Sequence, residues 1–213
     1  MCGRFELNNK MYREMNPDFN FDFYFKDDFD FERIDIRPTD MILSVDKDLN
    51  VSEKKWGMQF TDNLVFNSRI ETILEKEFWR ELFTHSRVIT PMTAFYEWTT
   101  NFNNDYRLAD SSKIPFRLAP ANKETHYLAS IIHKDSVSFI TTEPNEFMSG
   151  YHNRMPVILN KQNALKYLDG NVDDYFDLLK TAREITLKSE PGYGVMNEKI
   201  KRHFDGQSQI SLF

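Results

Sequence analysis

Cys2 is the residue of this sequence best suited to covalent chemistry, and it is the single cysteine of the chain. Cysteine is small enough for ordinary processing to remove the preceding Met1, which leaves a free α-amine and a thiol on adjacent carbons. The ordinary pKa values of these groups are about 8 and about 8.5, so both have a usable nucleophilic fraction near neutral pH. The neighbouring ammonium and any nearby arginine are expected to favour the thiolate further.

Such an aminothiol has two natural chemistries. The thiol can attack an acyl carbon, as in amidohydrolases that use an N-terminal nucleophile. Alternatively, the amine condenses with an aldehyde, and the thiol then closes the Schiff base to a stable thiazolidine ring. A cysteine at this position is also compatible with an incidental residue in a frayed terminus, so position alone does not decide between these interpretations.

Composition excludes several classes of function. One cysteine makes neither an intramolecular disulfide nor a thiolate-rich zinc site, and the five histidines show no metal-ligand spacing, so we expect no metal and no cofactor. A net charge of −6 argues against bulk affinity for nucleic acid but leaves room for a local basic groove. With no signal segment and no apolar run of membrane-spanning length, we expect a cytoplasmic monomer.

The pattern of elements predicts an α+β fold. Short strands rich in β-branched and aromatic residues, such as Val51–Gln59, are interrupted by a few helices without regular alternation. Helical spacing of apolar residues predicts helices over Glu71–Phe83, Lys161–Leu168 and Val172–Lys180. At 213 residues, the chain is expected to form one domain over residues 1–200, with a tail at 201–213.

Two segments have the composition of insertions. Thr99–Lys113 is polar and is predicted to be a loop between strands. In Asp18–Phe31 phenylalanines alternate with acidic or polar residues, which favours a half-buried strand whose rings face the core. Rings stacked on bases are the alternative, which the interleaved aspartates disfavour because they would repel phosphates.

Four separated segments closely resemble the SOS-response-associated peptidase (SRAP) family. In chain order they are Met1–Phe5 (MCGRF), Phe66–Thr72 (FNSRIET), Pro91–Trp98 (PMTAFYEW) and His152–Pro156 (HNRMP). Each motif is weak by itself, but four in order are specific. The chain departs from the family pattern after Trp56-Gly57, where Met58-Gln59-Phe60 replaces the usual Leu-Ile-Pro.

The resemblance implies both a fold and a function. The fold would be SRAP-like, a mixed β-barrel-like sheet flanked by a few helices, with a basic groove for single-stranded DNA. The mature Cys2 would attack the ring-opened aldehyde of an abasic site in a lyase-like reaction, and the covalent thiazolidine would shield the lesion during the DNA damage (SOS) response. The crosslinked protein would be found at the bacterial nucleoid. There are two alternatives. The first is a cysteine peptidase or amidohydrolase that uses the same Cys2, with autocatalytic removal of Met1 as the mildest form of this activity. The second is a non-covalent single-stranded DNA-binding module.

Three further residues of these motifs have catalytic roles that their chemistry allows. Asn67 offers amide donors and an acceptor that would hold the Cys2 backbone or the sugar. Glu97 lies between two aromatic residues, where desolvation would raise its pKa toward the range of a general acid. His152 would move a proton near pH 7 and so assist the opening of the sugar to its aldehyde. The alternatives are a turn-forming asparagine, a solvent-facing glutamate and a structural histidine.

Arginines of the motifs and their surroundings are the expected phosphate contacts, because a guanidinium group binds phosphate oxygens without reading sequence. Arg4 and Arg69 are the main candidates, and Arg80 and Arg87 are the weaker ones. Trp56 and Pro38 would form apolar groove wall beside a splayed base or belong to the core.

The last five residues, Gln209–Phe213 (QISLF), resemble the short peptide with which bacterial replication and repair proteins dock on the sliding clamp. Leu212 and Phe213 would fill a hydrophobic pocket while Gln209 makes polar contacts. A C-terminal strand packed on the body of the protein is the alternative.

Overall fold

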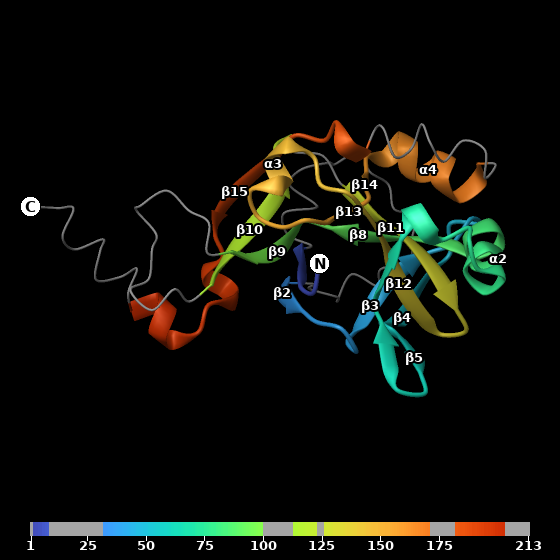
Figure 1. Ribbon diagram of the computed structural model, residues 1–213, viewed down its shortest axis with the longest axis horizontal. Coiled ribbons are helices and arrows are strands. Elements are labelled where there is room, and N and C mark those ends of the chain that lie inside the picture. The colour runs from blue at the N-terminus through green and yellow to red at the C-terminus, as the bar shows by residue number, and fades with distance from the viewer. Residues whose placement is uncertain (1, 9–31, 100–112, 123–125, 171–181, 203–213) are drawn as a thin grey trace, which may run out of the picture.

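Five strands close into a barrel on one side of the molecule (Figure 1). The computed structural model describes residues 2–8, 32–99, 113–122, 126–170 and 182–202. Each barrel strand pairs with the next around the ring, and β12 pairs with both β11 and β4, which closes it. The order around the ring is β4 (Val51–Trp56), β3 (Met41–Val45), β8 (Arg87–Met92), β11 (His126–His133) and β12 (Ser136–Thr142). The expected barrel-like sheet is therefore confirmed.

Short strands extend this barrel, and the sheet is mixed because β12 runs parallel to two of its neighbours, β4 and β7. A two-stranded hairpin, β5 with β6, connects β4 to β7. The additional strands are β5 (Met58–Phe60), β6 (Asn63–Val65), β7 (Asn67–Arg69), β13 (Met155–Pro156) and β14 (Ile158–Leu159).

A second sheet carries the N-terminal strand beside the barrel (Figure 1). Its order is β15-β10-β9-β1-β2, and all of its pairs are antiparallel. Thr93 alone separates β8 of the barrel from β9, so one nearly continuous stretch of chain joins the two sheets. The strands are β1 (Phe5–Asn8), β2 (Glu32–Ile36), β9 (Ala94–Thr99), β10 (Ile114–Pro120) and β15 (Leu187–Pro191).

Helices cover the outside of the barrel. α2 (Glu77–His85) and α4 (Lys161–Asp169) both pack on β8 and β11. Asn160 caps the N-terminus of α4, because its side chain accepts a hydrogen bond from the Asn163 amide. The shorter helices are α3 (Glu146–Ser149) and the 3-10 turns η1 (Ile70–Thr72) and η4 (Tyr193–Val195). The helix expected over Lys161–Leu168 is confirmed, whereas the ranges Asp18–Phe31 and Val172–Lys180 and most of Thr99–Lys113 lie outside the described residues.

Two expected elements are wrong in their bounds. The strand expected over Val51–Gln59 is broken at Gly57, whose φ of 113° suits glycine, and the Leu64 side chain occupies the space that a Cβ would need. The helix expected over Glu71–Phe83 begins only at Glu77. Its first residues form η1 instead, because contacts with other segments hold Glu71 in place, as described below.

Phe5 anchors the N-terminal segment in the core. Its ring lies edge-on to those of Trp56 and Phe139, with centroids 5.4 Å away in both cases. Trp56 itself stacks on Phe139 at 4.5 Å, is fully buried, and donates its indole N–H to the Phe66 carbonyl. Of the two interpretations of Trp56, groove wall or core, the structure supports the core, because its ring is buried and its polar atom is satisfied.

A buried carboxylate fixes β1 to its neighbours. Glu6 is 4% exposed and receives two hydrogen bonds from Arg117 on β10, at 2.9 and 2.7 Å, and one each from Thr93 and the Tyr96 hydroxyl. Burial by itself would raise the pKa of Glu6, but the bonds and charge of Arg117 outweigh it and lower the pKa below its ordinary value. The strand that begins just after Cys2 is thus held by a satisfied ionic network.

Replacing Arg117 by methionine should destabilise the protein by about 3 kcal/mol, because Glu6 would be left as an unpaired buried charge. Chemical denaturation at neutral pH measures this change. Arg183→Met is the matched control, since it breaks an exposed pair with Glu143 and should cost less than about 1 kcal/mol. Equal effects of the two substitutions would contradict the role given to Glu6.

Candidate functional site

Cys2 lies three residues before β1 and is enclosed by the protein. Its side chain is fully buried, and its thiol donates to the Arg4 carbonyl at 3.7 Å. The same carbonyl accepts the Tyr96 amide at 2.9 Å, which continues the pairing of β1 with β9 toward the terminus. Cys2 is therefore positioned by sheet pairing on one side and by core packing on the other.

Asn67 holds the Cys2 backbone from the barrel side. Its side-chain amide donates to the Cys2 carbonyl at 2.8 Å, which is the contact expected from its motif. The other polar atom of the same side chain, Oδ1, is buried and has no hydrogen-bond partner in the described part of the chain. A buried acceptor without a partner is costly, so this atom is ready to accept a bond from a bound group.

Glu97 brings a buried carboxyl group to the same place. It is 4% exposed on β9, and burial raises the pKa of this carboxyl group above its ordinary value. The positive charges of the amino terminus and of Lys113 oppose part of this shift. The raised pKa expected for Glu97 from its aromatic neighbours is found, which makes Glu97 a better proton donor than an exposed glutamate.

The thiol of Cys2 has the opposite property from the one expected. Burial raises the pKa of the thiol far above its ordinary value, and the nearby Glu97 carboxylate raises it further. The positive charge of the amino terminus lowers the pKa, but desolvation outweighs it. The expectation of a favoured thiolate is therefore wrong for this arrangement, in which Cys2 is a neutral thiol.

His152 is the third titratable group of the site. Burial lowers its pKa, and the positive charge of the amino terminus lowers it further. Its Nδ1 accepts the backbone N–H of Arg154 at 3.0 Å, which leaves the proton of the neutral ring on Nε2. The charge of Lys113 acts on both Glu97 and His152, and Glu97 acts on Cys2, which places the three titratable groups in one electrostatic neighbourhood.

An ion pair connects the segment of His152 to that of Asn67. Arg154 is 9% exposed and binds both carboxylate oxygens of Glu71, at 3.0 and 2.7 Å, and the Thr141 carbonyl at 2.8 Å. Glu71 also accepts the Glu143 amide. Sequence reasoning did not single out Arg154 or Glu71, although both lie within the quoted motifs, and their complementary charges were the available signal.

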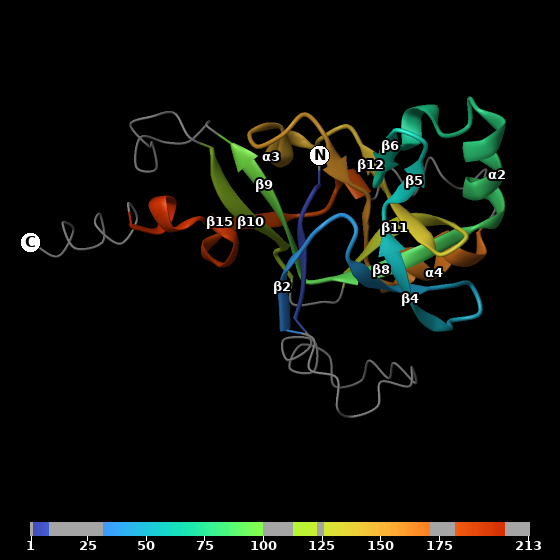
Figure 2. The same cartoon turned by 90° about the horizontal axis from the view of Figure 1, so that it is seen from below.

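The expected phosphate contacts fall into two groups. Arg4 lies two residues from Cys2, with its guanidinium group over the Trp98 ring. Arg69 is exposed on β7, on the strand face that also carries Asn67. It makes no ion pair with the residues described. Arg80 and Arg87 lie elsewhere: Arg80 is on α2, which is far from β1 in both views (Figures 1 and 2), and Arg87 begins β8 beside it.

The structure thus does not bring Arg80 and Arg87 to the Cys2 site. The Arg87 guanidinium donates to the Gly170 carbonyl and lies over the rings of Phe83 and Tyr167, so it is used in packing. Pro38, by contrast, is half-buried in the turn that follows β2.

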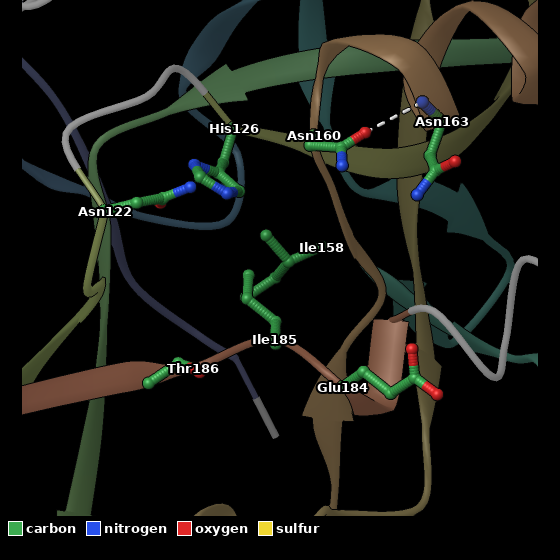
Figure 3. A pocket seen from close by; sticks show the side chains of 8 residues that line it. All are labelled: Asn122, His126, Ile158, Asn160, Asn163, Glu184, Ile185 and Thr186. Carbon is green, nitrogen blue, oxygen red and sulfur yellow. Dashed lines mark hydrogen bonds between the residues drawn. The ribbon is translucent and has the colours of Figure 1, made fainter.

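A hollow of about 290 Å³ lies beside the start of α4 (Figure 3). Asn67, Glu97 and His152 are not among the residues that line it. Its polar wall consists of amides, an imidazole, a hydroxyl and the Glu184 carboxylate, whose negative charge does not suit a phosphate. Its lining residues are Asn122, His126, Ile158, Asn160, Asn163, Glu184, Ile185 and Thr186.

Within the described ranges, no three histidine, cysteine or acidic side chains are grouped as metal ligands would be. None of the helices described there is long and apolar enough to cross a membrane.

The family model described as SOS response associated peptidase (SRAP) matches residues 1–195. This chain belongs to the SRAP family. Among the relatives of this SRAP chain, abasic site processing protein YoaM of Bacillus subtilis is 30% identical over 188 residues, which cover 79% of each protein. Abasic site processing protein YoqW of the same organism is 29% identical over 200 residues, which cover 84% of this chain and 86% of YoqW.

Solved structures show the same fold at lower identity. A protein from Bordetella bronchiseptica superposes on this SRAP chain with a TM-score of 0.65 at 17% identity, over 89% of this chain and 99% of its own. A phage-related protein of the same organism gives a TM-score of 0.63 at 16% identity, over 89% and 94%.

A raised thiol pKa and full burial should make Cys2 of this SRAP chain slow to alkylate. In protein that retains Met1, we expect iodoacetamide to react at pH 8 at least about tenfold more slowly with the folded chain than with the chain in guanidinium chloride. Glu97→Gln should increase the folded rate, because it removes a negative charge beside the sulfur, whereas Glu53→Gln on an exposed part of β4 should not. Mass spectrometry measures the reaction, and equal folded and denatured rates would contradict the description.

Proposed function

We propose that the mature protein processes abasic sites in single-stranded DNA by forming a covalent thiazolidine through Cys2. The observation that carries the proposal is the hold of Asn67 on the Cys2 backbone beside a buried acid, Glu97, and a neutral histidine, His152. The names of the relatives YoaM and YoqW, abasic site processing proteins, support the choice of substrate. Arg4 and Arg69 would contact the DNA backbone independently of sequence.

The reaction divides into two additions at one carbon. The α-amine of mature Cys2 attacks the aldehyde carbon of the opened sugar and gives a carbinolamine, from which the protonated Glu97 helps to expel one water. The thiol then adds to the resulting imine, with its sulfur bonding to carbon and its proton passing to nitrogen. His152, neutral at pH 7, would take and return the proton that moves when the sugar ring opens.

The state of the thiol favours this chemistry over acyl transfer. A cysteine peptidase needs a thiolate at the start of its reaction, and both burial and Glu97 oppose thiolate formation here. In thiazolidine formation the amine attacks first, and the neutral thiol reacts only after the electrophilic carbon has been placed beside it. The same site residues therefore support an aldehyde substrate better than an amide.

A denaturing gel tests the proposal. Incubation with single-stranded DNA that contains an abasic site should give a heat-stable shifted band, which Cys2→Ala should abolish because it removes the sulfur that closes the ring. A tag that blocks the amino terminus should also abolish the band, whereas the same tag at the carboxyl terminus should not. A shift seen only under native conditions would indicate non-covalent binding, and peptide cleavage without a crosslink would indicate a peptidase; either result overturns the proposal.

The role of Glu97 has its own test in the rate of that band. Glu97→Gln keeps the shape of the side chain but removes the proton donor, so the crosslinking rate should fall by about a hundredfold or more. Glu53→Gln, on the exposed face of β4, is the matched control and should react at the normal rate. An unchanged rate in Glu97→Gln would exclude Glu97 as the acid.

The tail is proposed to recruit the protein to a sliding clamp. Gln209, Leu212 and Phe213 lie outside the described residues, so this proposal rests on the peptide sequence alone. Deleting Gln209–Phe213 should abolish binding of the purified protein to a bacterial clamp, as measured by calorimetry, and should leave crosslinking of abasic DNA unchanged. Failure of the intact protein to bind the clamp would exclude this partner.

A further inference from the structure

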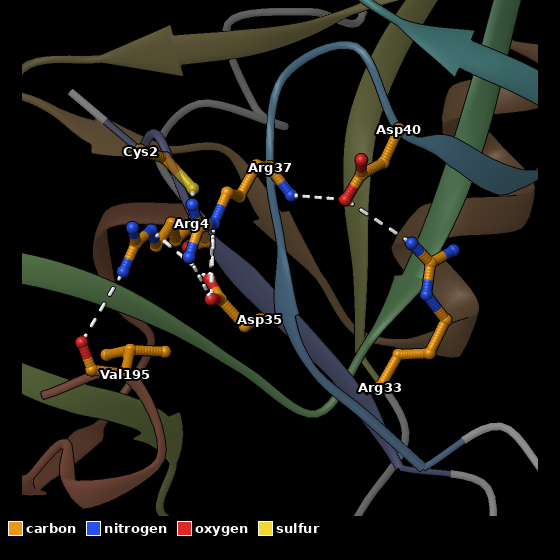
Figure 4. A network of polar contacts seen from close by, with 7 residues as sticks. All are labelled: Cys2, Arg4, Arg33, Asp35, Arg37, Asp40 and Val195. Carbon is orange, nitrogen blue, oxygen red and sulfur yellow. Dashed lines mark hydrogen bonds and ion pairs between the residues drawn. The ribbon is translucent and has the colours of Figure 1, made fainter.

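Two arginines share one carboxylate beside Cys2 (Figure 4). Asp35 on β2 binds the Arg4 guanidinium at 3.2 Å, and it binds Arg37 through both Nε and a terminal nitrogen, the shortest contact being 2.6 Å. Asp35 and Arg37 are two positions apart, so both lie on the same face of the extended chain. Arg4 itself is two residues from the reactive cysteine.

The turn that carries Arg37 is held in place. The Asp40 carboxylate accepts the Arg37 amide at 2.9 Å, and the Arg37 carbonyl accepts the Asp40 amide at 3.0 Å. Thr39 between them has a φ of 85°, a costly conformation for a β-branched residue, and its amide donates to the Trp56 carbonyl at 2.7 Å. Arg33 closes the turn by binding Asp40. Arg37 therefore stands at a fixed position and not on a loose loop.

Paired guanidinium groups around a single carboxylate form a site for an oxyanion. Arginine binds carboxylates and phosphates with the same planar fork of N–H donors, so a phosphate fits where Asp35 now lies. The Arg4 side chain is 22% exposed, with its guanidinium 4.9 Å from the centre of the Trp98 ring, while that of Arg37 is 56% exposed. Two positive charges facing one negative charge leave a net positive charge at the surface.

We propose that Arg4 and Arg37 clamp one phosphodiester group of single-stranded DNA next to the lesion, and that Asp35 occupies this clamp when DNA is absent. This inference rests on the proposed function and adds to it a phosphate-binding residue, Arg37, and an internal competitor. The ion pairs of Asp35 with Arg4 and Arg37 would have to break for DNA to bind, and the negative charge of Asp35 would repel the incoming phosphate. The competitor thereby weakens the binding of undamaged strands, whereas an abasic strand is retained by the covalent bond.

Binding of a lesion-free, labelled single strand tests the clamp without the chemistry of Cys2. Asp35→Asn should tighten binding about fivefold at low salt, because it removes a carboxylate that competes with phosphate. Arg37→Gln should weaken binding and reduce the slope of log affinity against log salt by about 0.7, the value for one phosphate contact. In the double variant, Arg37→Gln should cancel the gain from Asp35→Asn. Fluorescence anisotropy over a salt series measures all four proteins.

Asp135→Asn is the matched control, since it removes the same charge from an exposed pair with Lys54 in the turn between β11 and β12. If Asp35→Asn binds no more tightly than Asp135→Asn, the clamp is overturned, while the crosslinking assay still reports separately on the proposed function. If the wild-type protein and Asp35→Asn both fail to bind the strand, the clamp and the proposed affinity for single-stranded DNA are overturned together.

Discussion

A nucleophile at the end of a chain can be positioned for reaction only if that end is ordered. In this protein the packing of Phe5 against Trp56 and Phe139 fixes the segment that carries Cys2. The rings interlock at 4.5 to 5.4 Å, and a segment that would otherwise fray becomes part of the barrel core. The ionic network of Glu6 and the bond from Asn67 then fix the strand at both of its sides. The contacts that Cys2 makes with Arg4 and Asn67 depend on this anchorage.

The electrostatics of the site follow from burial more than from pairing. Desolvation favours the neutral form of each group, so it raises the pKa of Cys2 and Glu97 and lowers that of His152. The site thus holds a neutral thiol, a carboxyl group able to keep its proton and a neutral imidazole. Burial thus favours the uncharged form of all three groups at once.

Sequence reasoning reached the family, the barrel and the contact of Asn67 with Cys2, because these depend on motifs and on the chemistry of single residues. It failed where the outcome depended on tertiary packing. Whether Trp56 faces a groove or the core is not determined by its neighbours in sequence, and neither is the partner of Arg87. Asp35 and Arg154 were missed for the same reason: the fold brings their partners, Arg4 and Glu71, to them from distant parts of the chain.

The burial of the Cys2 sulfur also affects the lifetime of the protein. The proposed crosslink would consume Cys2 in a single reaction, so the thiol must remain intact until the protein meets its substrate. Peroxides attack thiolates that solvent can reach, and they convert them stepwise to sulfenic, sulfinic and sulfonic acids. A protonated sulfur with no exposed surface withstands this attack. For the proposed crosslink, the burial that slows alkylation of Cys2 would therefore also protect the thiol from oxidation until DNA binds.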